Sequence, residues 1–229
     1  MAIKKMKEQQ AGFSLLEIMI ALAVLGIVLA GVTKIFTTTG RYHTSQERMM
    51  EVMENIRAVK QLMTDEIRSA GCNPKNKRRI GFEPDTSDDR FDTDANSIHF
   101  TRDIDNGDND ALYEPDGDAE DPEENIGYFR GKTSDPTQTV PPGTPGTLYR
   151  VSFGASSYNS QPVADNVTDL QFRYYDKDSN EIINPTTTVN LDDIRTVEVT
   201  ITGQVQNTTR VSTKNRTWTQ QFRIRVRNR

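Results

Sequence analysis

Three residues near the N-terminus, Gly12, Phe13 and Glu17, have types and a spacing that suit a defined chemistry. Gly12 ends a short basic segment, and Phe13 begins an apolar run in which Ser14 and Glu17 are the only clearly polar side chains. Hydrolysis of the bond between Gly12 and Phe13 would create an α-amino group at the start of this run. A carboxylate in hydrocarbon is costly, so Glu17 needs a cation. That amine, on a neighbouring helix shifted by about one turn, would supply one.

Residues 13–32 form an apolar run that is long enough to cross a membrane. As a helix rising about 1.5 Å per residue it would span roughly 30 Å, the thickness of a bilayer's hydrocarbon core. Residues 1–12 carry three lysines and one glutamate, so the positive-inside rule places the N-terminus in the cytoplasm and the rest of the chain outside. An uncleaved signal anchor would share these features, but the combination of Gly12 and Glu17 favours a more specific signal.

The segment GFSLLE, residues 12–17, resembles the class III signal of type IV pilins and secretion pseudopilins. The resemblance implies that a membrane prepilin peptidase cleaves after Gly12 and methylates the new N-terminus at Phe13. It also implies that Glu17 guides docking into a growing filament by forming a charge pair. Residues 1–12 are then a cleaved leader, and residues 13–35 are the transmembrane and filament-core half of an N-terminal helix.

The predicted helix continues beyond the apolar run, because no proline follows Lys34 until Pro74. An unbroken helix over residues 14–70 would be about 85 Å long and would end near Gly71. Its second half, residues 36–70, is amphipathic and is expected to pack against a sheet. The apolar stripe comprises Met49, Met53, Ile56, Met63, Ile67 and Ala70 with Val59 beside it, and the opposite face carries Arg48, Glu51, Glu54, Arg57 and Lys60.

Residues 71–229 lose the helical period and are expected to form an extracytoplasmic, β-rich globular domain. A hairpin turn is expected at 176–180 and an exposed loop at 132–146. Short connections favour antiparallel pairing. The sequence therefore predicts an α+β, pilin-like fold, in which a long N-terminal helix packs against an antiparallel β-sheet. Strands are expected at 97–101, 125–129, 148–153, 170–175, 197–201 and 222–227.

Five downstream motifs carry a second resemblance: RSAGCNP at 68–74, LYR at 148–150, VADNV at 163–167, IRTV at 194–197 and RVRN at 225–228. In this order they look like the motifs of PilW-type minor pilins, relatives of the J-type minor pseudopilins of type II secretion. The resemblance implies a structural subunit, not an enzyme, that initiates or caps assembly of a type IV pilus. A minor, J-like pseudopilin of a type II secretion system is the alternative.

The same resemblance implies a location and a set of partners. The precursor is expected to cross the inner membrane once, with a cytoplasmic N-terminus and a periplasmic globular domain, and then to join an extracellular pilus. The expected partners are the prepilin peptidase, the major pilin, other minor pilins, the inner-membrane assembly platform and, before assembly, the membrane itself.

Residues 103–124 contain eleven acidic residues and no basic ones. Such a run is usually a solvated loop, because like charges repel one another and resist compact packing. The alternative is calcium, which binds carboxylate oxygens. The EF-hand pattern is broken at its fifth and sixth positions, which leaves a calcium loop of another kind as a hypothesis. Its ligands would be Asp103, Asp105, Asp110 and Glu114.

The remaining composition leaves few candidates for other chemistry. With 28 basic and 33 acidic residues the net charge is −5, so nucleic acid is not expected as a partner. The single cysteine, Cys72, excludes an intramolecular disulfide, and His43 and His99 are too few for a histidine metal site. Alternate arginines at the C-terminal strand, residues 223–227, are expected to share an outward face. Pairing with the acidic segment or protection of a sheet edge is favoured there over phosphate contact.

Overall fold

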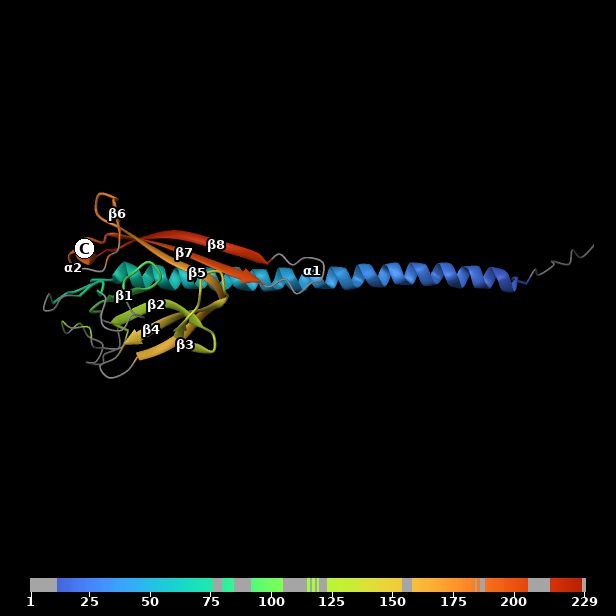
Figure 1. Cartoon of the computed structure of the whole chain (residues 1–229), viewed down its shortest axis with the longest axis horizontal. Helices are drawn as coiled ribbons and strands as arrows, with labels where there is room; N and C mark the ends of the chain where they lie inside the picture. Colours follow the sequence, from blue (N-terminus) through green and yellow to red (C-terminus); the bar gives the residue numbers. More distant parts are fainter. Residues whose placement is uncertain are drawn as a thin grey trace, which may run out of the picture. The chain divides into compact units, whose positions relative to one another are not determined.

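The computed structural model describes residues 12–75, 80–84, 92–104, 115, 117, 119, 123–153, 158–183, 185, 188–205 and 215–227. One long helix, α1 (Leu15–Ser69), precedes a set of strands that form an 8-stranded antiparallel sheet (Figure 1). The chain divides into two compact units, Met1–Gln46 and Glu47–Arg229, and α1 contributes to both. The other elements are β1 (Ile98–Thr101), β2 (Asn125–Lys132), β3 (Asp135–Thr139), β4 (Gly146–Phe153), β5 (Tyr158–Tyr175), β6 (Glu181–Ile182), α2 (Thr188–Asp192), β7 (Thr196–Val205) and β8 (Arg216–Arg225).

The long strand β5 joins the two halves of the sheet. The strand order is β1-β2-β4-β5-β7-β8, with β3 beside β2 and β6 beside β5. The first part of β5 pairs with β4, and from Val167 onward the strand pairs with β7. Beyond Val167, β4 no longer pairs with β5. There Phe172 of β5 donates its N–H to the carbonyl of Ala95, in the segment before β1 (2.8 Å). The sheet therefore changes neighbours within a single strand.

The second half of α1 packs on the sheet, as its amphipathic pattern predicts. Its buried residues are centred on Val52, Ile56, Val59 and Met63. Met49 is only partly buried, so the predicted position of the stripe was wrong by a fraction of a turn. The reason is the approach of β7: a Cβ added to Gly203 would lie 2.5 Å from Val52 Cγ1. Val52, which lies against β7, and Val59 are therefore both buried.

The predicted end of the helix is confirmed. Gly71 follows the last turn with φ 74°, a left-handed conformation that suits glycine. Its N–H bonds to the carbonyl of Thr101 at the end of β1 (3.0 Å). Three residues before Gly71, the carbonyl of Arg68 accepts the N–H of Arg227 (3.0 Å). The end of α1 is thus hydrogen-bonded to both β1 and the segment after β8.

The expected strands are all present, but the expected exposed loop at 132–146 was partly wrong. It contains β3, which pairs with the end of β2. Pro136 lies within β3, and β3 pairs on one side only, where a missing N–H is tolerated. Asp135 further orders the strand by accepting the N–H (3.0 Å) and the hydroxyl (2.7 Å) of Thr137. Part of this segment is therefore an edge strand rather than an open loop.

Candidate functional site

The residues predicted to carry the N-terminal chemistry lie at the start of α1. Gly12 and Phe13 precede the helix, and Glu17 lies in its first turn. The carbonyl of Ser14 accepts the N–H groups of Glu17 (3.0 Å) and Ile18 (3.2 Å), which starts the helical hydrogen bonding. Phe13 is 81% exposed. A Cβ on Gly12 would meet no atom within 4 Å, so packing within the described chain does not require glycine at this position.

The first half of α1 is apolar on all sides and exposed. It is long and apolar enough to cross a membrane, and none of its most apolar stretch is buried within the described chain. Beyond this stretch, threonine hydroxyls bond to helix carbonyls, Thr33 to Leu29 (2.8 Å) and Thr38 to Lys34 (2.7 Å). These bonds satisfy the hydroxyls locally. α1 is one continuous helix from the apolar half into the half that packs on the sheet.

A buried carboxylate that the sequence did not reveal joins the helix to the sheet. Glu66 of α1 accepts hydrogen bonds from Arg150 of β4, from Nε to Oε1 (3.0 Å) and from Nη2 to Oε1 (2.7 Å). The hydroxyl of Tyr128 on β2 donates to the other oxygen of Glu66. Both charged side chains of the pair are less than a tenth exposed. Because a buried charge is stable only when paired, this contact fixes the helix on β2 and β4.

Arg102 and Glu123 join these three residues. We call the whole set the buried ion network: Glu66, Tyr128, Arg150, Arg102 and Glu123. Arg102 lies 3.7 Å from Glu66 and donates from Nε to the carbonyl of Glu123 (2.8 Å). Arg150 also pairs with the carboxylate of Glu123, which is 48% exposed and lies on the solvent side of this otherwise buried network. Burial lowers the pKa of Arg150, but its bonds to Glu66 and Glu123 outweigh this and raise the pKa. Burial, together with the charge of Glu66, raises the pKa of the Tyr128 hydroxyl, so it stays protonated as a donor.

Of the four residues predicted to bind calcium, only Asp103 falls among the described residues. Its side chain is buried, and its N–H bonds to the carbonyl of Cys72 (2.8 Å). Asp105, Asp110 and Glu114 lie outside the described residues. Within the described part of the chain, no group of three or more histidine, cysteine or acidic side chains could hold a metal ion. The calcium loop therefore stays a prediction.

The arginines of β8 and the residues after it face outward, as predicted. Arg223, Arg225 and Arg227 alternate with the buried Phe222, Ile224 and Val226. Arg223 Nε bonds to Glu198 Oε2 of the neighbouring strand β7 (2.5 Å) and lies over the ring of Tyr175 (4.7 Å). Burial raises the pKa of the Glu198 carboxyl, but bonds from Arg223 and Gln221 lower it below its ordinary value. Arg223 thus has an acidic partner on its own sheet.

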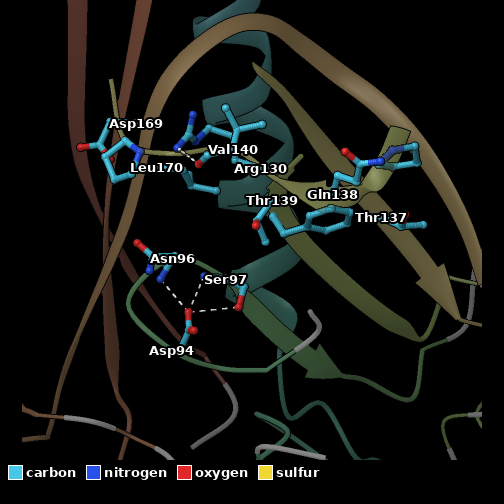
Figure 2. A pocket seen from close by; sticks show the side chains of 13 residues that line it. Asp94, Asn96, Ser97, Arg130, Thr137, Gln138, Thr139, Val140, Asp169 and Leu170 are labelled. Carbon is cyan, nitrogen blue, oxygen red and sulfur yellow. Dashed lines mark hydrogen bonds between the residues drawn. The ribbon is translucent and has the colours of Figure 1, made fainter. Parts of the chain in front are cut away.

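A pocket of about 210 Å³ lies where the sheet changes neighbours, between β2, β3 and the middle of β5 (Figure 2). Asp94 lies on one side of it, and its Oδ1 accepts the N–H groups of Asn96 and Ser97 (both 2.6 Å). On the other side, Arg130 Nη2 donates to the carbonyl of Val140 (2.7 Å). Asp94 therefore orders the turn before β1, and Arg130 ties β2 to the segment after β3.

The thiol and the histidines form no catalytic arrangement in the described residues. Cys72 is half-buried after the helix end, and burial together with the charge of Asp103 raises its pKa, which keeps it protonated and weakly nucleophilic. His99 of β1 contacts Asn125 Oδ1 through Nε2 (2.5 Å). His43 lies on the exposed part of α1.

A comparison with family models agrees with the N-terminal geometry. Residues 8–33 match the model of the prokaryotic N-terminal methylation motif. A search of curated proteins finds none that matches this chain. The motif is a type IV pilin-like prepilin signal, and with the long apolar helix on an antiparallel sheet it supports a pilin or pseudopilin precursor. Such a precursor is a structural protein that a prepilin peptidase processes and that its apolar helix anchors in a membrane.

Proposed function

We propose that this protein is a minor type IV pilin, a structural subunit that initiates or caps pilus assembly after cleavage and N-methylation. The observation that carries the proposal is the match to the methylation motif at residues 8–33, whose described part leads into the exposed, apolar start of α1. Cleavage follows Gly12, methylation occurs on Phe13, and Glu17 pairs with the N-terminal amine of a neighbouring subunit. Among the described residues no packing contact requires glycine at position 12, which supports a role in recognition by the peptidase.

The proposed division of the chain follows from these roles. Residues 1–12 are the cleaved leader, and residues 13–35 are first the membrane anchor and then the filament core. Residues 36–70 are the amphipathic half of the helix. Residues 71–229 form the globular domain, which is periplasmic before assembly and extracellular afterwards, and which contacts other minor pilins and the major pilin.

The minor role is favoured by the motifs downstream of the helix, which resemble those of PilW-type proteins. A J-like minor pseudopilin of a type II secretion system has the same N-terminal motif and the same helix-on-sheet architecture, so it is the second candidate. Deletion of the gene separates the two functions. Loss of surface pili with intact protein secretion supports the pilin, and the reverse result supports the pseudopilin.

The direct test is mass spectrometry of the N-terminal peptide of the protein recovered from sheared surface filaments. The proposal requires a chain that begins at Phe13 and carries one added methyl group. Gly12→Val should leave residues 1–12 attached, because its side chain crowds the scissile bond. Ala11→Val adds bulk one residue earlier and serves as the matched control that should still be cleaved. A wild-type chain that keeps residues 1–12 in cells with an active prepilin peptidase would refute the proposal.

A further inference from the structure

The outer edge of β8 exposes backbone hydrogen-bonding groups. β8 ends the strand order, is drawn in red at the margin of the sheet in Figure 1, and pairs with β7 along its whole length without a register shift. Just after the strand, Val226 donates its N–H to Arg195, the residue before β7 (3.0 Å), whereas Arg227 donates its N–H to Arg68 of α1 (3.0 Å). Successive residues of an antiparallel strand point these groups to opposite edges. Even-numbered residues of β8 therefore bond to β7, and odd-numbered ones point outward.

At Arg227 the outward N–H has a partner in the end of the helix. Further back along the strand, the outward carbonyl of Gln221 accepts a hydrogen bond from the side-chain Nε2 of its neighbour Gln220 (3.2 Å), which a docking strand would replace. Among the described residues, no strand lies beside the outward groups of Thr217, Thr219 and Gln221. This stretch contains no charge, no proline and no bulge, which are the usual devices that protect an edge strand from pairing. Its middle is thus competent to accept another strand.

A cationic groove runs beside this edge. It has a volume of about 500 Å³ and lies between α1 and β8, with Arg57, Lys60 and Asp65 among its lining residues on the helix and Gln220 on the strand. Lys60 Nζ lies 5.6 Å from the centre of the Phe222 ring of β8, so its charge is held close to the strand. The exposed arginines at 216 and 225 add positive charge at the two ends of β8. The charge of this region therefore favours an acidic occupant.

We propose that β8 is the docking edge for an extended, acid-bearing segment of a neighbouring subunit. The segment adds to the sheet as a further strand through the outward groups of Thr217, Thr219 and Gln221. Because the side chains of a strand alternate between its two faces, every second residue of the segment lies over the groove, where acidic side chains meet Arg57 and Lys60. That the occupant is a subunit of the same assembly rests on the proposed function. The pairing itself does not.

The test uses the full chain in detergent micelles and two synthetic ten-residue peptides, one alternating threonine with glutamate and one alternating threonine with lysine. Amide hydrogen exchange is followed by NMR. In the free chain the odd-numbered amides at 217, 219 and 221 should exchange faster than the even-numbered ones. The glutamate peptide should slow the odd-numbered amides by about tenfold or more, and the lysine peptide should not. Trp218, the only tryptophan in the sequence, gives a second readout by its emission.

Two variants separate the backbone and charge contributions. Thr219→Pro removes one outward N–H and the hydroxyl contact with Thr202 of β7 (3.0 Å) but leaves the backbone bonds to β7, so it should abolish protection by the glutamate peptide with only a small change in melting temperature. Arg57→Glu should weaken binding of the glutamate peptide about tenfold, and Arg173→Glu, on an exposed part of β5, is the matched control that should not.

Three results would overturn the inference. They are slow exchange of the odd-numbered amides in the free chain, equal protection by both peptides, and no protection by either peptide at millimolar concentration. All three results come from hydrogen exchange, and mass spectrometry of the same preparation shows independently whether the chain has been cleaved before Phe13. Failure of the pairing is thereby distinguished from failure of the proposed function.

Discussion

Arg150→Met tests the most consequential contact between the helix and the sheet. Methionine keeps an apolar stem of similar length but removes the charge that pairs with Glu66, and both side chains are less than a tenth exposed. Removing one partner of a buried pair costs about 3–5 kcal/mol, because the remaining charge stays desolvated. Arg102 remains 3.7 Å from Glu66 and the hydroxyl of Tyr128 still donates to it. The lower end of the range, about 3 kcal/mol, is therefore expected.

The assay is urea unfolding of the full chain in micelles, followed by the emission of Trp218, which packs against the core next to β7. Arg173→Met is the matched control, since Arg173 also lies on a strand of the sheet but its pair with Glu181 is exposed at 3.9 Å. The control should lose at most about 1 kcal/mol. Removing both charges, with Glu66→Leu added to Arg150→Met, should restore at least half of the loss. A single variant within about 1 kcal/mol of wild type, or a double variant less stable than the single, would refute the reasoning.

Three further outcomes are expected. Gly203→Ala should lower the free energy of unfolding by about 1–3 kcal/mol, because its Cβ would lie 2.5 Å from Val52 Cγ1. In a Val52→Ala background, urea unfolding should show a smaller loss. An equal loss in both backgrounds would contradict the close approach. The pKa of the Glu198 carboxyl is lowered in the folded state, so the stability that its ionised form contributes is present above its ordinary pKa of about 4.3 and is lost as pH falls through the lowered value. In thermal melts below about pH 5, Arg223→Gln should therefore lose less stability than wild type. Parallel losses in the two proteins would argue against the pair. Glu17→Ala should leave the protein cleaved and membrane-bound but reduce its amount in sheared filaments, measured by immunoblot, and an unchanged amount would exclude the charge pair.

The sequence could predict what local patterns determine. The apolar run, the helix that ends before Gly71 and the alternating strands depend on neighbours within a few residues, and the structure confirms each. The hairpin turn at 176–180 is also present, with Asp176 Oδ1 accepting the N–H groups of Asp178 and Asn180 (both 2.8 Å). The roles of Gly12, Phe13 and Glu17 stay predictions; they could be proposed from the sequence because the motif matched at residues 8–33 is contiguous.

The buried ion network could not be predicted because its members are brought together only by the complete fold. Glu66 and Arg150 are 84 residues apart in the sequence. A glutamate on a charged helix is ordinarily solvated; the one available signal was that position 66 continues the spacing of the buried Val59 and Met63. The groove beside β8 was likewise hidden, since it depends on which strand ends the sheet and on how the helix lies across it.

The way in which the end of α1 is attached to the domain has a mechanical consequence. Its last turns are linked to β1 through Gly71, to the segment after β8 through Arg68, and to β4 through Glu66. A pulling force along α1 would therefore act at the same time on β1 and β8, at the two edges of the sheet, and on β4 in its interior. Several hydrogen bonds would then have to break together before the end of α1 separated from the sheet, so the attachment resists force better than bonds that break one after another.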